Sequence, residues 1–189
     1  MDVQIEAVPL EQRGIWRNLY PLYQFELSQF WECPMNHFGV FDENPDVETL
    51  AQSADFCDRF WEDRGWLPSW IRADGQIAGL SLVGTRENEF VPAHVDCEMM
   101  EFWVMPRYRR VGIGRQAAQM ILRHGRQWGY GYDWKVLALE NNVPAIRFWR
   151  RVLGEMNLTH LREERDAEGI NWYLRVEAPP NPSNELVEE

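Results

Sequence analysis

The chain has 189 residues, of which 45% are hydrophobic, 26% charged and 13% aromatic, including ten tryptophans. This composition is typical of one packed globular domain and argues against intrinsic disorder. The formal net charge of −11 argues against nucleic acid as a partner of the whole protein.

The N-terminal residues show no secretory signal, and no apolar run reaches the length of a membrane span, so we expect a cytoplasmic protein without membrane contact. The three cysteines, Cys33, Cys57 and Cys97, are widely and irregularly spaced and form no CxxC pair. We therefore expect reduced thiols, with neither a disulfide framework nor a metal site.

Alternating apolar and polar residues predict a first strand at residues 3–8. A helical pattern follows over 10–30, with a break or kink expected at Pro21. Residues 31–46 are rich in turn-forming types and predict a loop, and a second helix is expected over 47–62.

The period then changes to two. Strands predicted at 67–73 and 76–84 flank Asp74 and Gly75, a dipeptide that strongly favours a tight hairpin. A long third strand is predicted over 95–105, so the sheet has antiparallel members.

The C-terminal half alternates helices and strands. A helix after Val111 places apolar residues at spacings of three and four, which predicts a buried face. That face comprises Ile113, Ala117, Met120, Ile121, His124 and Trp128. A buried strand at 134–140, a helix at 142–153 and a final hairpin of 155–165 with 170–177 complete the pattern.

These elements predict an α/β (α+β) domain with a single mixed, mostly antiparallel sheet of about seven strands flanked by helices. The domain is expected over residues 1–177. Residues 178–189 are rich in proline and acidic residues, and we expect a flexible tail there.

Charge is distributed unevenly along the chain. Residues 1–64 contain 13 acidic and four basic residues, whereas residues 105–151 contain ten basic and two acidic ones. An acidic and a basic region in one chain indicate two ligands, or two halves of one reaction. Charged residues on solvated helix faces would give the same counts.

The stretch RRVGIG joins a predicted strand to a predicted helix. Such a turn directs free main-chain N–H groups and the positive end of the helix dipole at one point, which favours an anion. Gly112 and Gly114 allow close approach of a phosphate, and Arg109, Arg110 and Arg115 add positive charge.

Two motifs carry a resemblance to a known family. VMPRYRRVGIG resembles the acyl-coenzyme A signature of the GNAT acetyltransferase superfamily, and NVPAIRFW, from Asn142 to Trp149, resembles its second motif. The order of elements over about residues 2–177 is similar as well, and the run from EFWV through RYRR and GIG to FWRRV resembles a poorly characterised bacterial subgroup of predicted acetyltransferases.

The resemblance implies acetyl-CoA as the cofactor, bound between two strands that separate after Val104 and near Leu139. It implies that main-chain amides of Arg110, Val111, Gly112, Ile113, Gly114 and Arg115 hold the pyrophosphate, together with Arg109. The pantetheine arm would pair with the backbone of Phe102, Trp103 and Val104. Asn142 would contact the arm or cap the next helix, and Ala145, Phe148 and Trp149 would line the thioester pocket.

Direct acyl transfer to an amine also needs a proton acceptor. Glu98 and Glu101 lie on the predicted strand at 95–105, where the superfamily often places a glutamate base. Their opposite parity means that only one faces the cofactor unless a bulge intervenes. Glu98 is slightly favoured because it shares parity with Phe102 and Val104; surface pairing with Arg86 or Arg107 is the alternative for either carboxylate.

Trp149 stands where many relatives have a tyrosine that protonates the departing thiolate. An indole N–H cannot supply that proton, but a thiol with a pKa near 8.5 leaves adequately without a positioned acid. Tyr108 could substitute, although packing is the more ordinary role for it.

The N-terminal region is both acidic and aromatic, and the resemblance makes it the wall of the acceptor site. Tyr23, Glu26 and Trp31 are the predicted acceptor-binding residues, and they suit a cationic small molecule or a peptide amine. Core packing is the competing explanation for most aromatic residues here.

Three functions therefore compete: an acetyl-CoA-dependent N-acetyltransferase, a non-catalytic acyl-CoA-binding or sensor domain, and an interaction module that uses the basic face. We favour the first, with a homodimer as a further expectation.

Overall fold

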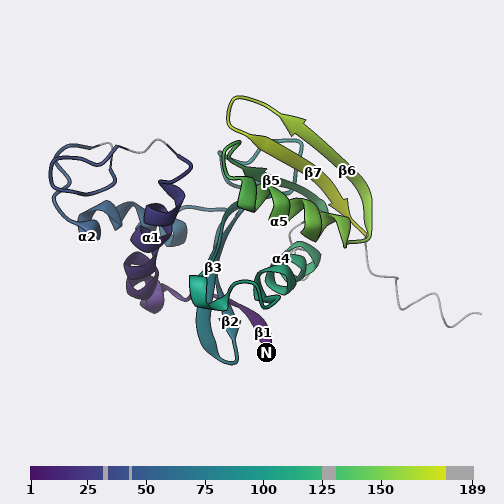
Figure 1. Cartoon of the computed structure of the whole chain (residues 1–189), viewed down its shortest axis with the longest axis horizontal. Coiled ribbons are helices and arrows are strands. Elements are labelled where there is room, and N and C mark those ends of the chain that lie inside the picture. Colours follow the sequence, from purple (N-terminus) through teal and green to yellow (C-terminus); the bar gives the residue numbers. More distant parts are fainter. Residues whose placement is uncertain (32–33, 43, 125–130, 178–189) are drawn as a thin grey trace, which may run out of the picture.

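The computed structural model describes residues 1–31, 34–42, 44–124 and 131–177, and it contains one seven-stranded sheet (Figure 1). The strand order is β1-β2-β3-β4-β5-β7-β6, and only the β4–β5 pair is parallel. The strands are β1 Val3–Ala7, β2 Trp66–Ala73, β3 Gln76–Thr85, β4 Cys97–Val104, β5 Asp133–Ala138, β6 Leu158–Arg165 and β7 Ile170–Val176. The predicted fold class is thus confirmed.

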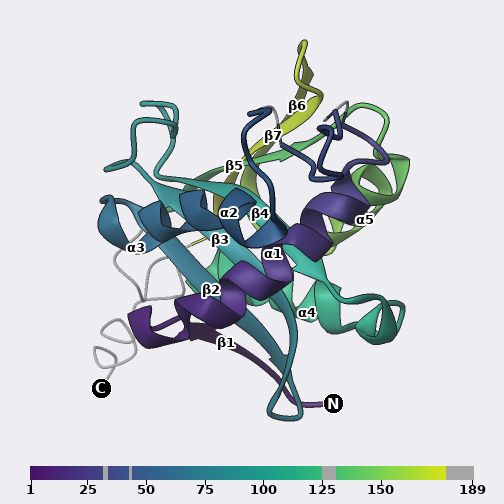
Figure 2. The same cartoon turned by 90° about the vertical axis from the view of Figure 1, so that its left-hand side faces the viewer.

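Helices cover both faces of the sheet (Figure 1). On one face lie α4 (Ile113–His124) and α5 (Val143–Gly154), whose apolar sides pack on β4, β5 and β7. On the other face lies α1 (Arg13–Leu27), which Figure 2 shows crossing in front of the strands. The fully buried Trp16 anchors α1 against Trp70 of β2, with ring centroids 5.5 Å apart.

The expected second helix at 47–62 is wrong. The segment forms α2 (Leu50–Ser53), the 3₁₀ turn η2 (Asp55–Asp58) and α3 (Arg59–Glu62). Its buried apolar residues Ala54, Cys57 and Phe60 recur every third position, which suits a 3₁₀ turn because residues i and i+3 eclipse there.

Other local predictions are confirmed or refined. Asp74 and Gly75 both have positive φ, at 48° and 78°, as the tight β2–β3 hairpin requires. Helix α1 continues through Pro21, which lies inside it. Two further 3₁₀ turns are η1 (Leu10–Gln12) and η3 (Pro106–Tyr108).

Some predictions fall outside the described residues: Cys33, Trp128 and the tail at 178–189, while the side chain of His124 is likewise not described. Cys57 and Cys97 are buried free thiols, and burial raises the pKa of each to about 12. Within the described ranges, no helix is long and apolar enough to cross a membrane, and no cluster of three potential metal ligands occurs.

Two features of β4 position the candidate site. β5 pairs with it only from Cys97 to Met99, so the edge of β4 beyond Met99 is left open toward β5. On its other edge, Met99 pairs with Val83 and Glu101 pairs with Leu82, so Met100 forms a β-bulge.

Candidate active site

The open edge of β4 forms one wall of the candidate site. After Met99 the parallel pairing stops, and β5 continues beside β7 as far as Ala138. The backbone of Phe102, Trp103 and Val104 pairs with β3 on one side only. Its other edge can therefore receive hydrogen bonds from an extended ligand, as the sequence predicts.

The glycine turn after β4 lies next to this edge. Arg110 has a φ of 63° and Gly112 a φ of 91°, so the turn uses two left-handed residues before α4 begins. None of the described residues accepts a hydrogen bond from the main-chain N–H groups of residues 110–115. A hollow of about 370 Å³ lies over Val111, Gly112, Ile113 and Arg115, beside Met1 and Val3. Free amides at a helix N-terminus favour a phosphate.

The three arginines of the turn differ in their partners. The Arg109 guanidinium donates to the carbonyl oxygen of Val104 and pairs with the Glu26 carboxylate of α1. Arg115 pairs with Glu155, with Nη1 3.1 Å from Oε2. Arg110 is exposed and forms no ion pair with any described residue. Arg109 thus links the turn to α1, and its contact with a phosphate stays a prediction.

The gap between β4 and β5 beyond Met99 is called the opening below. Aromatic rings line its α5 side. Phe102 of β4 stacks on Phe148, with ring centroids 5.6 Å apart, and meets Trp149 edge-on at 5.3 Å. A Cβ on Gly114 would lie 3.4 Å from both Phe148 and Val104, at ordinary van der Waals distance, so α4 is close to these two side chains here. Trp149 is buried, at 4% exposure, within the core cluster.

Asn142 caps helix α5. Its side-chain oxygen accepts a hydrogen bond from the main-chain N–H of Ala145 at 3.0 Å. Of the two roles considered for Asn142, the structure shows the capping role. Ala145 is half-buried and packs against the core beside Phe148.

The bulge at Met100 places both candidate glutamates on the α1 face of the sheet. Glu101 pairs with Leu82, which belongs to the core under α1, whereas Met99 and Phe102 pack on the opposite face. The expectation that Glu98 shares a face with Phe102 and Val104 is therefore wrong. Side chains alternate between the two faces of a strand, and the extra residue Met100 shifts this alternation by one position. Odd and even sequence positions therefore do not keep to one face along β4.

Glu98 is held in an ion pair. Its Oε1 lies 2.8 Å from the Nζ of Lys135 on β5, and both side chains are buried. Burial raises the pKa of the Glu98 carboxyl, and the Lys135 ammonium partly offsets that effect. Neither Arg86 nor Arg107 is the partner of Glu98; Arg86 pairs with Asp96.

Glu101 has a different environment, just beyond the point where β4 and β5 separate. Tyr20 donates its hydroxyl hydrogen to Oε1 at 2.9 Å, and Tyr23 donates to Oε2. Burial raises the pKa of the Glu101 carboxyl, while the two phenol hydrogen bonds act in the opposite direction. Glu101 is a half-buried residue, and a carboxylate with a raised pKa is a suitable proton acceptor.

The last turns of α1 are attached on both sides of the opening. Glu26 pairs with Arg109 after β4, and the carbonyl of Phe30 accepts a hydrogen bond from Asn141 after β5, at 3.2 Å. Tyr23 lies against Glu101, and Trp31 is 44% exposed just past the helix. The three predicted acceptor-binding residues, Tyr23, Glu26 and Trp31, therefore lie on one segment near the opening.

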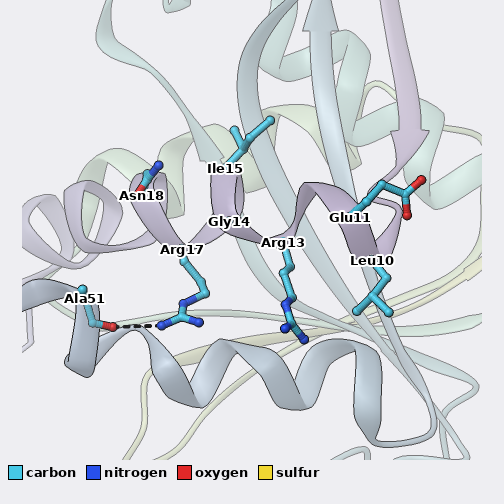
Figure 3. A pocket seen from close by; sticks show the side chains of 8 residues that line it. All are labelled: Leu10, Glu11, Arg13, Gly14, Ile15, Arg17, Asn18 and Ala51. Carbon is cyan, nitrogen blue, oxygen red and sulfur yellow. Dashed lines mark hydrogen bonds between the residues drawn. The ribbon is translucent and has the colours of Figure 1, made fainter.

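A larger hollow, of about 790 Å³, lies elsewhere on α1 (Figure 3). Arg13 and Arg17 point from α1 toward the α2–α3 segment, and Arg17 donates to the carbonyl of Ala51 at 3.3 Å. Both guanidinium groups pair with Asp58, at 3.9 and 3.5 Å. None of the predicted site residues lines this hollow.

Three residues that complete the site were not among the predicted site residues: Tyr20, Lys135 and Asn141. Tyr20 had a visible signal, since it lies three positions before Tyr23 on a helix and so on the same side. Lys135 is the single lysine of the chain and lies in a strand predicted to be buried, which indicates a specific partner.

Comparison with known proteins agrees with this geometry. The family model described as the Acetyltransferase (GNAT) family matches residues 16–154. A search of curated proteins gave no significant match.

Solved structures share the fold at low sequence identity. The PaiA N-acetyltransferase of Thermoplasma acidophilum, in complex with coenzyme A, is 10% identical over 93% of this chain and 99% of that one, with a TM-score of 0.60. An aminoglycoside acetyltransferase in complex with coenzyme A is 9% identical over 93% and 95%, with a TM-score of 0.61. A spermidine N-acetyltransferase of Vibrio cholerae with coenzyme A and spermine is 16% identical over 92% and 95%, with a TM-score of 0.58.

The chain belongs to the GNAT family of acetyltransferases. It is an N-acetyltransferase, and its acyl donor is acetyl-CoA.

Proposed function

We propose that the protein transfers an acetyl group from acetyl-CoA to the amine of a small cationic molecule or a peptide, by direct attack, with Glu101 as the proton acceptor. One observation carries this proposal: the Glu101 carboxylate lies on the α1 face of the sheet, just beyond the point where β4 and β5 separate, and is held there by two phenols. The free amides of the glycine turn follow shortly after the end of the same strand.

The residues of the opening suit acetyl-CoA. Amides of residues 110–115 have no acceptor among the described residues, and Arg110 adds a positive charge without an ion-pair partner there, so a diphosphate fits. The open edge of β4 at Phe102–Val104 suits the amide groups of a pantetheine arm. The bound donor supplies a thioester carbon that the amine attacks, with a thiolate as leaving group.

Acidic residues lie on the α1 side of the opening, where the acceptor would bind. Glu101 and Glu26 both lie there, and Arg109 neutralises only Glu26. A neutral amine must form near Glu101 before attack, and the raised pKa of that carboxyl makes it a better proton acceptor. Among the structural neighbours, one was solved with spermine and another is named for aminoglycosides, which supports a cationic amine.

Cofactor binding and turnover test this proposal separately. Coenzyme A at 100 times its Kd should add about 2.7 kcal/mol to the free energy of unfolding. For a chain of this size the melting temperature should rise by about 5–10 °C. Thiol release should then be measured with acetyl-CoA and spermidine, an aminoglycoside, or a peptide with a free N-terminal amine. Thermal stabilisation without turnover of any of these amines would contradict a cationic small molecule or a peptide as the acceptor, and no stabilisation would contradict a cofactor site at this turn.

Replacing Trp149 with tyrosine tests whether a thiolate acid is needed. We expect Trp149→Tyr to retain turnover or to raise it by up to about tenfold, because a phenol beside the leaving thiol can donate a proton. The smaller ring should cost about 1–2 kcal/mol of stability, since Trp149 is buried against Phe102. A large loss of kcat with unchanged Kd for coenzyme A would show that the indole has another role.

A further inference from the structure

The Glu101 carboxylate is enclosed by two phenols from successive turns of one helix. Tyr20 donates a hydrogen bond to Oε1 and Tyr23 donates one to Oε2. Both tyrosines lie about 80 positions from Glu101 in the sequence. A phenol that donates its hydrogen to a carboxylate keeps lone pairs on its oxygen, so it can accept a second hydrogen bond. Any amine that meets a phenol oxygen here is therefore one hydrogen bond away from Glu101.

The two phenols are not equivalent. Tyr20 is 6% exposed and packs edge-on against Phe56 and Tyr23, with ring centroids 5.3 and 5.6 Å away. Tyr23 is half-buried and lies next to Trp103, with ring centroids 6.3 Å apart. Of the two tyrosines, Tyr23 is the residue with more surface exposed.

The charge state of the cluster suits proton transfer through a neutral phenol. Burial and the neighbouring carboxylate raise the pKa of Tyr20 and Tyr23 well above the ordinary value, so both phenols stay protonated. Of the other titratable groups, the Cys57 thiol of η2 lies near enough that burial and the Glu101 carboxylate raise its pKa, and Glu98 lies on the same face of β4. Glu98 is held by Lys135, and Glu26, one turn beyond Tyr23, is held by Arg109.

We propose that Tyr23 is a catalytic proton relay, which accepts a proton from the reacting amine while it passes its own phenol proton to Glu101. This inference rests on the proposed function. As the nitrogen–carbon bond forms and the carbon–sulfur bond breaks, the electron pair of that bond leaves with the thiolate. The amine proton moves to the Tyr23 oxygen, the phenol proton moves to Oε2 of Glu101, and Tyr23 is neutral before and after. Tyr20 is a positioning residue, because its hydrogen bond fixes the other carboxylate oxygen.

The matched variants Tyr23→Phe and Tyr20→Phe test the relay. Each removes one hydroxyl from the same carboxylate, so each should move the acid limb of the kcat/KM profile to higher pH. At the pH plateau, Tyr23→Phe should lower kcat at least about tenfold, whereas Tyr20→Phe should lower it no more than about threefold. The assay uses acetyl-CoA with spermidine, or with the panel amine that is turned over fastest, and thermal melting and the Kd for coenzyme A report on folding.

Each outcome decides the relay. A wild-type plateau kcat in Tyr23→Phe, or an equal loss in Tyr20→Phe, would overturn it and leave the proposed function intact if Glu101 is still required. Full turnover by Glu101→Gln, or no turnover of any amine by a protein that binds coenzyme A, would overturn the proposed function and the relay together.

Discussion

Glutamine in place of Glu101 should lower kcat by about 10²- to 10⁴-fold, the usual contribution of a general base. Glutamine keeps the size of the side chain but cannot take a proton. Its carbonyl oxygen can accept from one of the two phenols, while its NH2 group takes the place of the other acceptor and must donate to that phenol oxygen. Steady-state kinetics with acetyl-CoA and a turned-over amine give the measurement. The Kd for coenzyme A should stay within about threefold of wild type, because Glu101 lies on the α1 face and the glycine turn is separate.

Glu98→Gln is the discriminating comparison, since both carboxylates lie on the same face of β4. Glu98 already holds Lys135 at 2.8 Å, so its oxygen is occupied by a cation and is a poorer acceptor. A large loss of kcat in Glu98→Gln together with near-normal turnover in Glu101→Gln would reverse the assignment. Loss in both variants, with lower melting temperatures only for Glu98→Gln, would still identify Glu101 as the base.

The Glu101→Gln substitution should raise the stability of the fold although it lowers kcat. The folded-state pKa of Glu101 is raised, so its carboxyl stabilises the fold most when protonated and loses that contribution as the pH rises through the folded-state pKa. Glu101→Gln should therefore be more stable than wild type by about 0.5–2 kcal/mol near pH 8, with a gain of about 2–4 °C in melting temperature per kcal/mol. The difference should vanish in acid. A lower melting temperature for Glu101→Gln at pH 8 would mean that the ionised carboxylate is structural.

The element order of this fold could be predicted from local patterns. Alternating strands, the Asp74–Gly75 hairpin and the amphipathic helices α4 and α5 were all visible in the sequence. The segment at 47–62 could not be predicted correctly, because spacings of three fit either an α-helix or a 3₁₀ turn over such a short length. The packing of Cys57 and Phe60 under α1 decides between them.

The candidate site also combines features that local sequence patterns predict with features that only the folded chain shows. The glycine turn and its helix are local features, so the sequence located them, and the open edge of β4 follows where the resemblance implied it. The bulge at Met100 depends on the pairing of β4 with Leu82 and Val83, which no periodicity within β4 reveals. The Tyr23–Glu101 and Glu26–Arg109 contacts join positions about 80 residues apart, so they appear only once the chain is folded.

The turn before α4 offers a second large effect through one methyl group. Gly112 has a φ of 91°, and a Cβ at this position would meet nothing within 4 Å, so Gly112→Ala costs backbone strain and no clash. Strain of this kind is on the order of 1–2 kcal/mol. The turn can relieve it by rotating toward negative φ, which redirects the amides at 112 and 113. Each charge-assisted hydrogen bond lost to a phosphate is worth about 1.5–3 kcal/mol, so the Kd for coenzyme A should rise by about 10- to 100-fold.

Gly75→Ala is the matched control for this effect. Gly75 has a φ of 78°, and a Cβ there would likewise meet no atom within 4 Å, but this glycine lies in the β2–β3 hairpin. Both variants should lose a similar amount of melting temperature, whereas only Gly112→Ala should lose affinity in calorimetric titration with coenzyme A. Equal affinities in the two variants would mean that the main-chain amides of the turn do not bind the diphosphate. Because the strain is matched, a difference in Kd reports the direction of these amides and not the stability of the domain.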